Sequence, residues 1–324
     1  MSFDELLKLS PDQIKDIARK DICADLIDQT KTEAGKQELL KTIRSAPDDE
    51  IKMMATISNI PEKHHNIFLN IVKGESNEFQ KELDNLEYLL ETGDILLIQG
   101  ESISSKALST LQKITYKGAK SSHVAIVHAE FMCIDAIPKI GVRHVTIPNL
   151  LPKDLSRFRV MRLKTLTDEE QKKIMSLAGF YLEQPYKISP LKKQSKKFSY
   201  CSELARKIYT KGNVQNTAIP SNTIVSPADF DRILNSSDKW LDITDLVKPF
   251  IVFCMNYKEI IENISLQITT GFKLNKKRYN ERREFLETLE KNSEISLEKK
   301  EKIRKQFKTM EDKLHHKFWD NNSL

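Results

Sequence analysis

The sequence predicts an α+β protein in which an antiparallel sheet or small barrel lies between helical regions at both ends of the chain. Apolar residues recur at helical spacing near the two termini, whereas short runs of valine and isoleucine follow one another closely in the middle. The chain has 324 residues, of which 39% are hydrophobic, enough for a core in more than one domain. We expect a helical N-terminal domain over residues 1–88, a sheet-containing domain over 89–254 and a charged helical extension over 255–324.

The N-terminal region begins with a helix signal. Ser10 and Gln13 have the spacing of a capping box, and Pro11 stands at the first helical position. Apolar residues then recur at helical spacing as far as Leu90. Because no pattern of catalytic or metal-binding residues stands out here, we expect a domain for packing or interaction.

Short strands are predicted after residue 93. Gly93 and Asp94 interrupt the helical pattern, and an apolar run of strand length follows them. Further runs rich in valine and isoleucine come in close order, separated by polar or proline-containing turns, which is typical of an antiparallel meander or small barrel. The predicted strands cover residues 95–98, 123–129, 132–137, 142–147 and 158–163.

Helices are predicted between and after these strands. Thr167 and Glu170 form a capping box, and Ser226 with Asp229 marks the start of another helix. The basic stretch 183–199 contains two prolines and is predicted to be a loop. The predicted helices cover residues 103–116, 168–181, 201–210 and 227–234.

The C-terminal extension carries one narrow apolar seam on a basic helix. Such a seam predicts docking on another helix, of this chain or of a protein partner. Because basic residues outnumber acidic ones over 273–318, contact with a membrane surface is the second possibility. The residues of the seam are Ile303, Phe307, Met310, Leu314 and Phe318.

Charge and composition bound the class of protein. The net charge of +6 permits an anionic partner without requiring one. A nucleic-acid binder is the least favoured class, because the basic tail lacks interleaved aromatic residues and a helix-turn-helix pattern. The N-terminus lacks the basic and then apolar runs of a signal peptide, and no apolar stretch reaches the roughly 20 residues that span a bilayer. We expect a cytoplasmic protein, or an effector exported by a dedicated system.

The cysteines are too far apart for a zinc cluster or a disulfide scaffold, so no metal is expected and reduced thiols are favoured. One of them, Cys201, follows a polar loop and begins a predicted helix. The N–H groups and dipole at a helix start favour a thiolate there, which makes Cys201 a candidate nucleophile. The alternative is a small buried side chain, as most free cysteines are. The four cysteines are Cys23, Cys133, Cys201 and Cys254.

A histidine and an aspartate are the candidate partners of this thiol. His123 opens an apolar strand, which would hold an imidazole rigidly enough to act as a base. Asp135 lies inside the next strand, where a carboxylate is costly unless it is paired, and could orient that imidazole. The alternatives are a structural histidine and an acid on the solvent face. Cys133 shares a strand face with Asp135 and is interpreted as a core residue.

Several strings together resemble a known family. Gly93-Asp94-Ile95 comes first, then Ser122-His123-Val124-Ala125-Ile126-Val127, then Ile134-Asp135-Ala136, and finally Tyr200-Cys201-Ser202-Glu203-Leu204. In this order, histidine before cysteine, they resemble the circularly permuted papain-like amidases, and more narrowly the YiiX/YebB-like branch of the NlpC-type superfamily. The resemblance covers about residues 90 to 250.

The resemblance implies a permuted papain-like core that needs no metal or cofactor. It implies Cys201 as nucleophile, His123 as base and Asp135 as third residue, a place where the family often has glutamate. His144 is a lesser candidate for that third role, with an exposed strand histidine as the favoured alternative. The residues expected to support the site are Tyr200, Glu203, Ser122 and Asp94.

The function that follows is acyl transfer through a thioester intermediate. The first expectation is cleavage of an amide bond in a peptide or peptidoglycan-like substrate. The second is a lipid-directed thiol acyltransferase or phospholipase, and the third a catalytically inactive adaptor. Intact Cys201, His123 and Asp135 count against the third.

Overall fold

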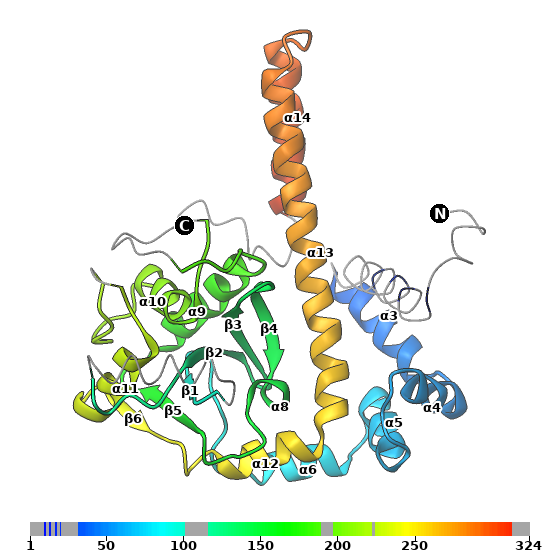
Figure 1. Ribbon diagram of the computed structural model, residues 1–324. Coiled ribbons are helices and arrows are strands. Elements are labelled where there is room, and N and C mark those ends of the chain that lie inside the picture. Colours follow the sequence, from blue (N-terminus) through cyan, green and yellow to red (C-terminus); the bar gives the residue numbers. More distant parts are fainter. Residues whose placement is uncertain are drawn as a thin grey trace. The chain divides into compact units, whose positions relative to one another are not determined.

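The computed structural model describes residues 32–100, 116–188, 197–221 and 224–312, together with Ser10, Gln13, Ile17 and Lys20 (Figure 1). The chain forms two compact units, one of residues 78–262 and one of residues 1–77 with 263–323. The predicted α+β class is confirmed, because a six-stranded antiparallel sheet and many helices make up the structure. The predicted division into three parts stays a prediction.

The N-terminal helices of the second of these units are short and amphipathic. Ser10 and Gln13 exchange hydrogen bonds of 2.8 and 3.3 Å between their side chains and backbones, which confirms the predicted capping box. The helices pack through a few buried apolar residues, such as Ile51 and Phe68. The helices are α3 (Glu33–Arg44), α4 (Asp48–Ile57), the 3-10 helix η1 (Glu62–His64) and α5 (His65–Lys73).

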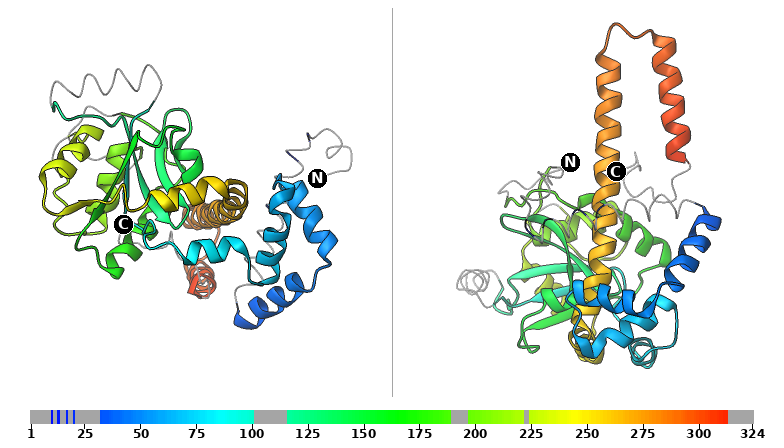
Figure 2. Two further views of the ribbon diagram at one scale, coloured as in Figure 1. Left: turned by 90° about the horizontal axis from the view of Figure 1, so that it is seen from below. Right: turned by 90° about the vertical axis from the view of Figure 1, so that its right-hand side faces the viewer.

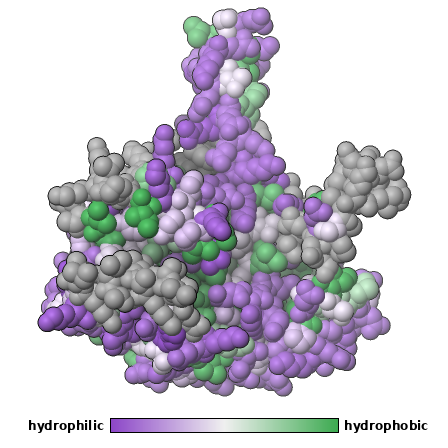
Figure 3. Space-filling model, viewed as in Figure 1, coloured by the Kyte–Doolittle hydropathy of each residue, from purple (hydrophilic) through white to green (hydrophobic). Residues whose placement is uncertain are grey.

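The C-terminal extension is a helical hairpin, which the right-hand view of Figure 2 shows. Helix α13 (Lys258–Lys291) is followed by α14 (Leu297–Asp312), and the rings of Phe285 and Phe307 stack with centroids 5.2 Å apart. At Phe307 the predicted seam therefore docks on a helix of the same chain. The visible surface of the hairpin is mainly hydrophilic (Figure 3). Leu314, Phe318 and the side chain of Met310 lie outside the part of the chain that the structure describes. Cys23 also lies outside it.

The sheet of the other unit is antiparallel throughout, in the order β4-β3-β2-β1-β5-β6. Because β4 and β6 are its edges, the sheet is open rather than a closed barrel. Five of its strands fall where they were predicted, the fourth within one residue; β6 is too short for a sequence signal. The strands are β1 (Ile95–Ile98), β2 (His123–Ala129), β3 (Met132–Ile137), β4 (Gly141–Thr146), β5 (Phe158–Leu163) and β6 (Trp240–Asp242).

Helices of this unit begin at the predicted caps. The capping boxes Thr167/Glu170 and Ser226/Asp229 are both formed. Helix α10 packs against β2 and β3, and α9 against β2. The helix predicted over 103–116 falls almost wholly outside the described residues. The helices are α6 (Glu78–Asp84), α8 (Ile147–Leu150), α9 (Asp168–Tyr181), α10 (Cys201–Lys211), α11 (Pro227–Ser236) and α12 (Lys248–Asn256).

Both faces of the central strands are covered. All four residues of β1 are buried, which explains why its sequence is a continuous apolar run instead of an alternation. Among the described helices, none combines the length and the apolar character that crossing a bilayer would require.

Candidate active site

Cys201 is the first residue of α10 and is buried. Tyr200 before it has an extended backbone and serves as the N-cap. The approach to the helix is held by Lys207, which lies two turns further along α10. Its Nζ donates to the carbonyl of Phe198 and, at 2.8 Å, to Oγ of Ser199. A buried lysine thus fixes the backbone that leads into the thiol.

A second segment, which we call the stem (residues 183–187), ties this approach to the edge of the sheet. Val142 of β4 exchanges two 2.8 Å backbone hydrogen bonds with Glu183 and Gln184, and Tyr186 pairs with Ser199. Gly141 permits this contact, since its φ is +89° and a Cβ there would lie 2.2 Å from the carbonyl oxygen of Gln184. Only glycine fits such a position.

The thiol lies where β2 and β3 separate. The pairing of these strands runs from Ile126↔Ile134 to Ala129↔Met132 and stops short of His123. Beyond the end of this ladder, the backbone N–H of Val124 is turned to Cys201 and donates a hydrogen bond to its sulfur. Ser202 adds a contact of 3.7 Å between its Oγ and Sγ.

His123 links the thiol to Asp135. Its Nε2 lies 2.9 Å from Oδ2 of Asp135, so Nδ1 is the nitrogen left to hydrogen-bond with Cys201. Asp135 is 1% exposed, whereas the imidazole is 21% exposed. The structure thus brings the three predicted residues into one row, thiol, imidazole and carboxylate. Every member comes from a regular element, which fixes the geometry.

Electrostatics in this row favour a charged pair. Burial alone would raise the pKa of Cys201, but hydrogen bonds from His123, Ser202 and Val124 and the charge of His123 outweigh it and lower that pKa. Burial would likewise lower the pKa of His123, yet the hydrogen bonds and charges of Asp135 and Cys201 raise it. Both shifts stabilise a thiolate beside an imidazolium.

Arg143 is a member of the site that sequence reasoning missed. Its Nε donates to Oδ1 of Asp135 at 3.0 Å and its Nη2 to Oδ2 at 3.5 Å. Burial would raise the pKa of Asp135, but the hydrogen bonds and charges of His123 and Arg143 lower it, so the carboxylate is ionised. The signal was available, since a hairpin that turns at residue 139 places 143 opposite 135.

The start of β2 is anchored by α11. Asp231 is fully buried and accepts hydrogen bonds from the backbone N–H groups of Lys120 and Ser121, both at 2.8 Å, and from Oγ of Ser121 at 2.9 Å. Ser122, a predicted supporting residue, accepts from the backbone of Gly100 at 2.9 Å. These bonds hold the backbone directly before His123, and Asp231 was not predicted.

The other predicted supporting residues differ in their distance from the row. Glu203 is buried on the first turn of α10, with an oxygen 3.7 Å from Nζ of Lys207. Tyr200 adjoins the thiol, and burial raises its pKa to about 12. Asp94 requires a correction: it lies at the opposite end of β1 from Ile98, the residue that pairs with His123. Its carboxylate binds Arg162 at 2.8 and 2.6 Å instead.

His144 is likewise placed away from the row. Residues of β4 alternate in direction, so Arg143 points to Asp135 and His144 to the other face of the sheet. There its Nε2 lies 2.7 Å from Nδ1 of His128, and burial lowers the pKa of His128 to about 4. His144 is therefore half-buried and paired, neither the third residue of the row nor the exposed histidine expected otherwise.

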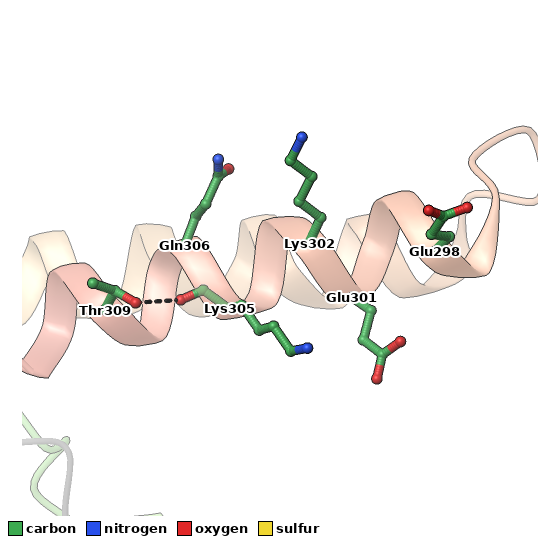
Figure 4. Close-up of a pocket in the computed structure, with 6 residues that line it drawn as sticks. All are labelled: Glu298, Glu301, Lys302, Lys305, Gln306 and Thr309. Atoms are coloured by element: carbon green, nitrogen blue, oxygen red, sulfur yellow. Dashed lines mark hydrogen bonds between the residues drawn. The ribbon is translucent and has the colours of Figure 1, made fainter.

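The described residues contain no cluster of three or more histidine, cysteine or carboxylate side chains that could hold a metal ion. A hollow of about 430 Å³ lies beside the ends of β1 and β5 and is lined by Lys120 and Arg159, among others. Another lies along α14, where the lining side chains come from one helix and point in different directions (Figure 4). Neither hollow is lined by Cys201, His123 or Asp135.

An open antiparallel sheet with α10 set at the separation of two strands defines a permuted papain-like α+β domain. Residues 89–240 match the model of the family described as permuted papain-like amidase enzyme, YaeF/YiiX, C92 family. A crystal structure titled metalloprotein yiiX, from Escherichia coli O157:H7, matches 48% of this chain and 97% of its own at 20% identity, with a TM-score of 0.36. None of the curated proteins matches the chain.

Proposed function

We propose that the chain is a cysteine-dependent amidase with Cys201 as nucleophile and His123 as the proton carrier. One observation supports it above all: a buried thiol with a lowered pKa shares a hydrogen bond with an imidazole, which lies 2.9 Å from a buried carboxylate. A nucleophile, a base and a group that orients the base are the three parts that acyl transfer requires. The amidase family of residues 89–240 agrees with this chemistry.

The reaction starts from the thiolate–imidazolium pair. Sγ of Cys201 attacks the carbonyl carbon of the amide, and the carbonyl oxygen takes the negative charge. The backbone N–H of Cys201, at the start of α10, stabilises that oxyanion. The imidazolium of His123 then gives its proton to the amide nitrogen, the C–N bond breaks, and an amine leaves behind a thioester.

Water completes the cycle. His123, now neutral, takes a proton from a water molecule while the water oxygen attacks the thioester carbon. The C–S bond then breaks, and the carboxylic acid product leaves. Asp135 stays ionised throughout and holds the imidazole with Nδ1 toward the sulfur. If another nucleophile took the acyl group in place of water, the same thioester would be an intermediate of acyl transfer. That reaction is the alternative to hydrolysis.

The test is to trap the acyl-enzyme. We expect peptide amides, including peptidoglycan-like stem peptides, to leave an acyl group on the full-length protein, which peptide mass spectrometry locates on Cys201. Cys201→Ala abolishes turnover and the adduct, whereas Cys254→Ala, at a buried cysteine of α12, retains both. Turnover that persists in Cys201→Ala, or an adduct on another residue, would refute the proposal.

A further inference from the structure

The rim of the candidate active site is basic although its row contains a carboxylate. Asp135 is 1% exposed, while the side chain of Arg143 is 33% exposed. Since the imidazole of His123 is also partly exposed, the two basic groups that contact Asp135 reach solvent, whereas the carboxylate does not. An incoming molecule therefore meets positive charge before it reaches the thiol.

Arg143 has donors left for a ligand. Its guanidinium carries five N–H donors. One on Nε and one on Nη2 face Asp135, which is the only partner of Arg143 among the described residues. The remaining donors belong to the edge that includes Nη1, and they form a planar fork suited to a carboxylate.

The stem begins with the exposed acid Glu183 and ends with the exposed base Lys187, and the residues after it add an excess of positive charge. The stem is bonded to Val142, the neighbour of Arg143 in β4, and Lys187 at its end is bonded through its backbone to Ser199, two residues before the thiol. Nζ of Lys187 lies 5.3 Å from the centre of the Phe198 ring. Between residues 184 and 202 the sequence has no acidic residue, and its lysines are Lys187, Lys192, Lys193, Lys196 and Lys197.

A neutral donor completes the rim. Tyr186 of the stem is half-buried, and burial together with the nearby charge of Cys201 raises the pKa of its phenol to about 12. Its hydroxyl therefore keeps its proton at any physiological pH. Because Tyr186 pairs with Ser199 and is close enough to feel the charge of Cys201, its hydroxyl is a neutral donor near the thiol.

We propose that the substrate of this site is an amide that bears a carboxylate near the scissile bond, and that Arg143 binds this carboxylate with Lys187 as a weaker second contact. The inference rests on the proposed function and narrows its substrate class from amides to anionic amides. It assigns two partners to the guanidinium of Arg143. One edge binds the buried Asp135, and the other edge binds the substrate. A phosphate would meet the same donors, and the experiment separates the two anions.

The experiment compares matched alkylating probes on the full-length protein. N-bromoacetylglycine and N-bromoacetylglycinamide differ only in the terminal group, a carboxylate in the first and a neutral carboxamide in the second, and with each the thiolate forms an S–C bond while bromide leaves. The rate at Cys201 is followed by peptide mass spectrometry. The ratio of the two rates cancels any change in thiol reactivity, so it reports only recognition of the carboxylate. We expect the acid to react faster than the amide by about fivefold at low salt, with a smaller ratio at high salt.

Variants then locate the recognition. Arg143→Gln removes the preference, Arg143→Lys keeps part of it, and Lys187→Gln, at an exposed stem residue, lowers it by a smaller factor. Lys164→Gln is the matched control, since Lys164 is exposed and follows β5 at the end of the sheet away from His123; it keeps the full ratio. If Arg143→Gln fails to fold, the rate ratio of Lys187→Gln and its dependence on salt still show whether the basic side chains recognise the carboxylate.

Three results would overturn the inference. One is a wild-type ratio near one, and another is a ratio that Arg143→Gln and Lys187→Gln leave unchanged. The third is an Arg143-dependent preference for N-bromoacetylethanolamine phosphate over the carboxylate probe, which would make phosphate the ligand. Failure of the proposed function looks different: Cys201 would then react no faster than Cys254 with any probe.

Discussion

Removal of the imidazole is the most direct perturbation of the row. His123→Ala takes away the hydrogen bond and the positive charge that lower the pKa of Cys201, and burial is then the dominant influence, which raises that pKa. At pH 6 an ordinary thiol with a pKa of about 8.5 is only about 0.3% ionised. A thiol ionised by its neighbour gains up to about 300-fold in thiolate, and the lower nucleophilicity of a stabilised thiolate reduces the advantage to roughly tenfold.

The assay is iodoacetamide labelling between pH 5 and 9, with the adduct located by mass spectrometry. In the wild type, Cys201 is expected to label at least about tenfold faster at pH 6 than an ordinary thiol, and its rate rises less steeply with pH, because the pKa of its thiol is lowered. In His123→Ala the rate is low at pH 6 and climbs with pH.

Two buried thiols of the same chain are internal references. Burial raises the pKa of Cys133 and of Cys254 far above the ordinary value, so both should stay unlabelled while the protein is folded. Circular dichroism of His123→Ala shows whether the fold is retained. Labelling of Cys201 that is equally fast at pH 6 with and without His123 would refute the reasoning.

Three further predictions concern residues that position the row. Asp135→Asn should lower kcat for a peptide amide by about 10²–10⁴-fold, measured against retained folding by circular dichroism, because the amide no longer stabilises the imidazolium. Gly141→Ala should lower the free energy of unfolding by at least about 2 kcal/mol in urea titrations, because its φ of +89° and the carbonyl of Gln184 leave no room for Cβ, whereas Ile140→Ala should change it little. Asp231→Asn should cost about 1–3 kcal/mol in the same titrations, because an amide cannot accept all three hydrogen bonds from residues 120 and 121, whereas Asp238→Asn at an exposed site should not.

Local signals in the sequence were sufficient for much of the fold. The valine and isoleucine runs mark β1 to β5, and the capping boxes at Thr167 and Ser226 mark the starts of α9 and α11. Cys201 was placed at a helix start because a polar loop precedes an amphipathic stretch. Each of these signals acts over a few residues, so no tertiary contact is needed to interpret it.

Long-range pairing explains what was missed. Asp231 reaches the start of β2 across more than a hundred residues, and no local pattern announces that contact. Asp94 was assigned to the site from the string in which it occurs, but the antiparallel register puts it at the far end of β1, beside Arg162. For His144 and Arg143 the deciding quantity is strand parity, which depends on the register of the hairpin formed by β3 and β4 and not on either residue alone.

Arg143 also influences the pKa of His123. Arg143 and His123 both contact Asp135, so the positive charge of Arg143 lies near the imidazole and opposes its protonation. Arg143→Gln removes this repulsion, and the pKa of His123 then rises further. Because His123 must be protonated to release the amine, the loss of activity at high pH should move to higher pH in the variant.

In Arg143→Gln the acidic limb of the pH–activity profile should also move to higher pH, for a different reason. The pKa of Asp135 rises when the Arg143 hydrogen bonds are lost, so its charge disappears at a less acidic pH than in the wild type. The profile of kcat against pH for a neutral peptide amide measures both limbs. A variant whose profile only scales down, with neither limb displaced, would show that Arg143 does not act on the row through Asp135 and contacts the substrate alone.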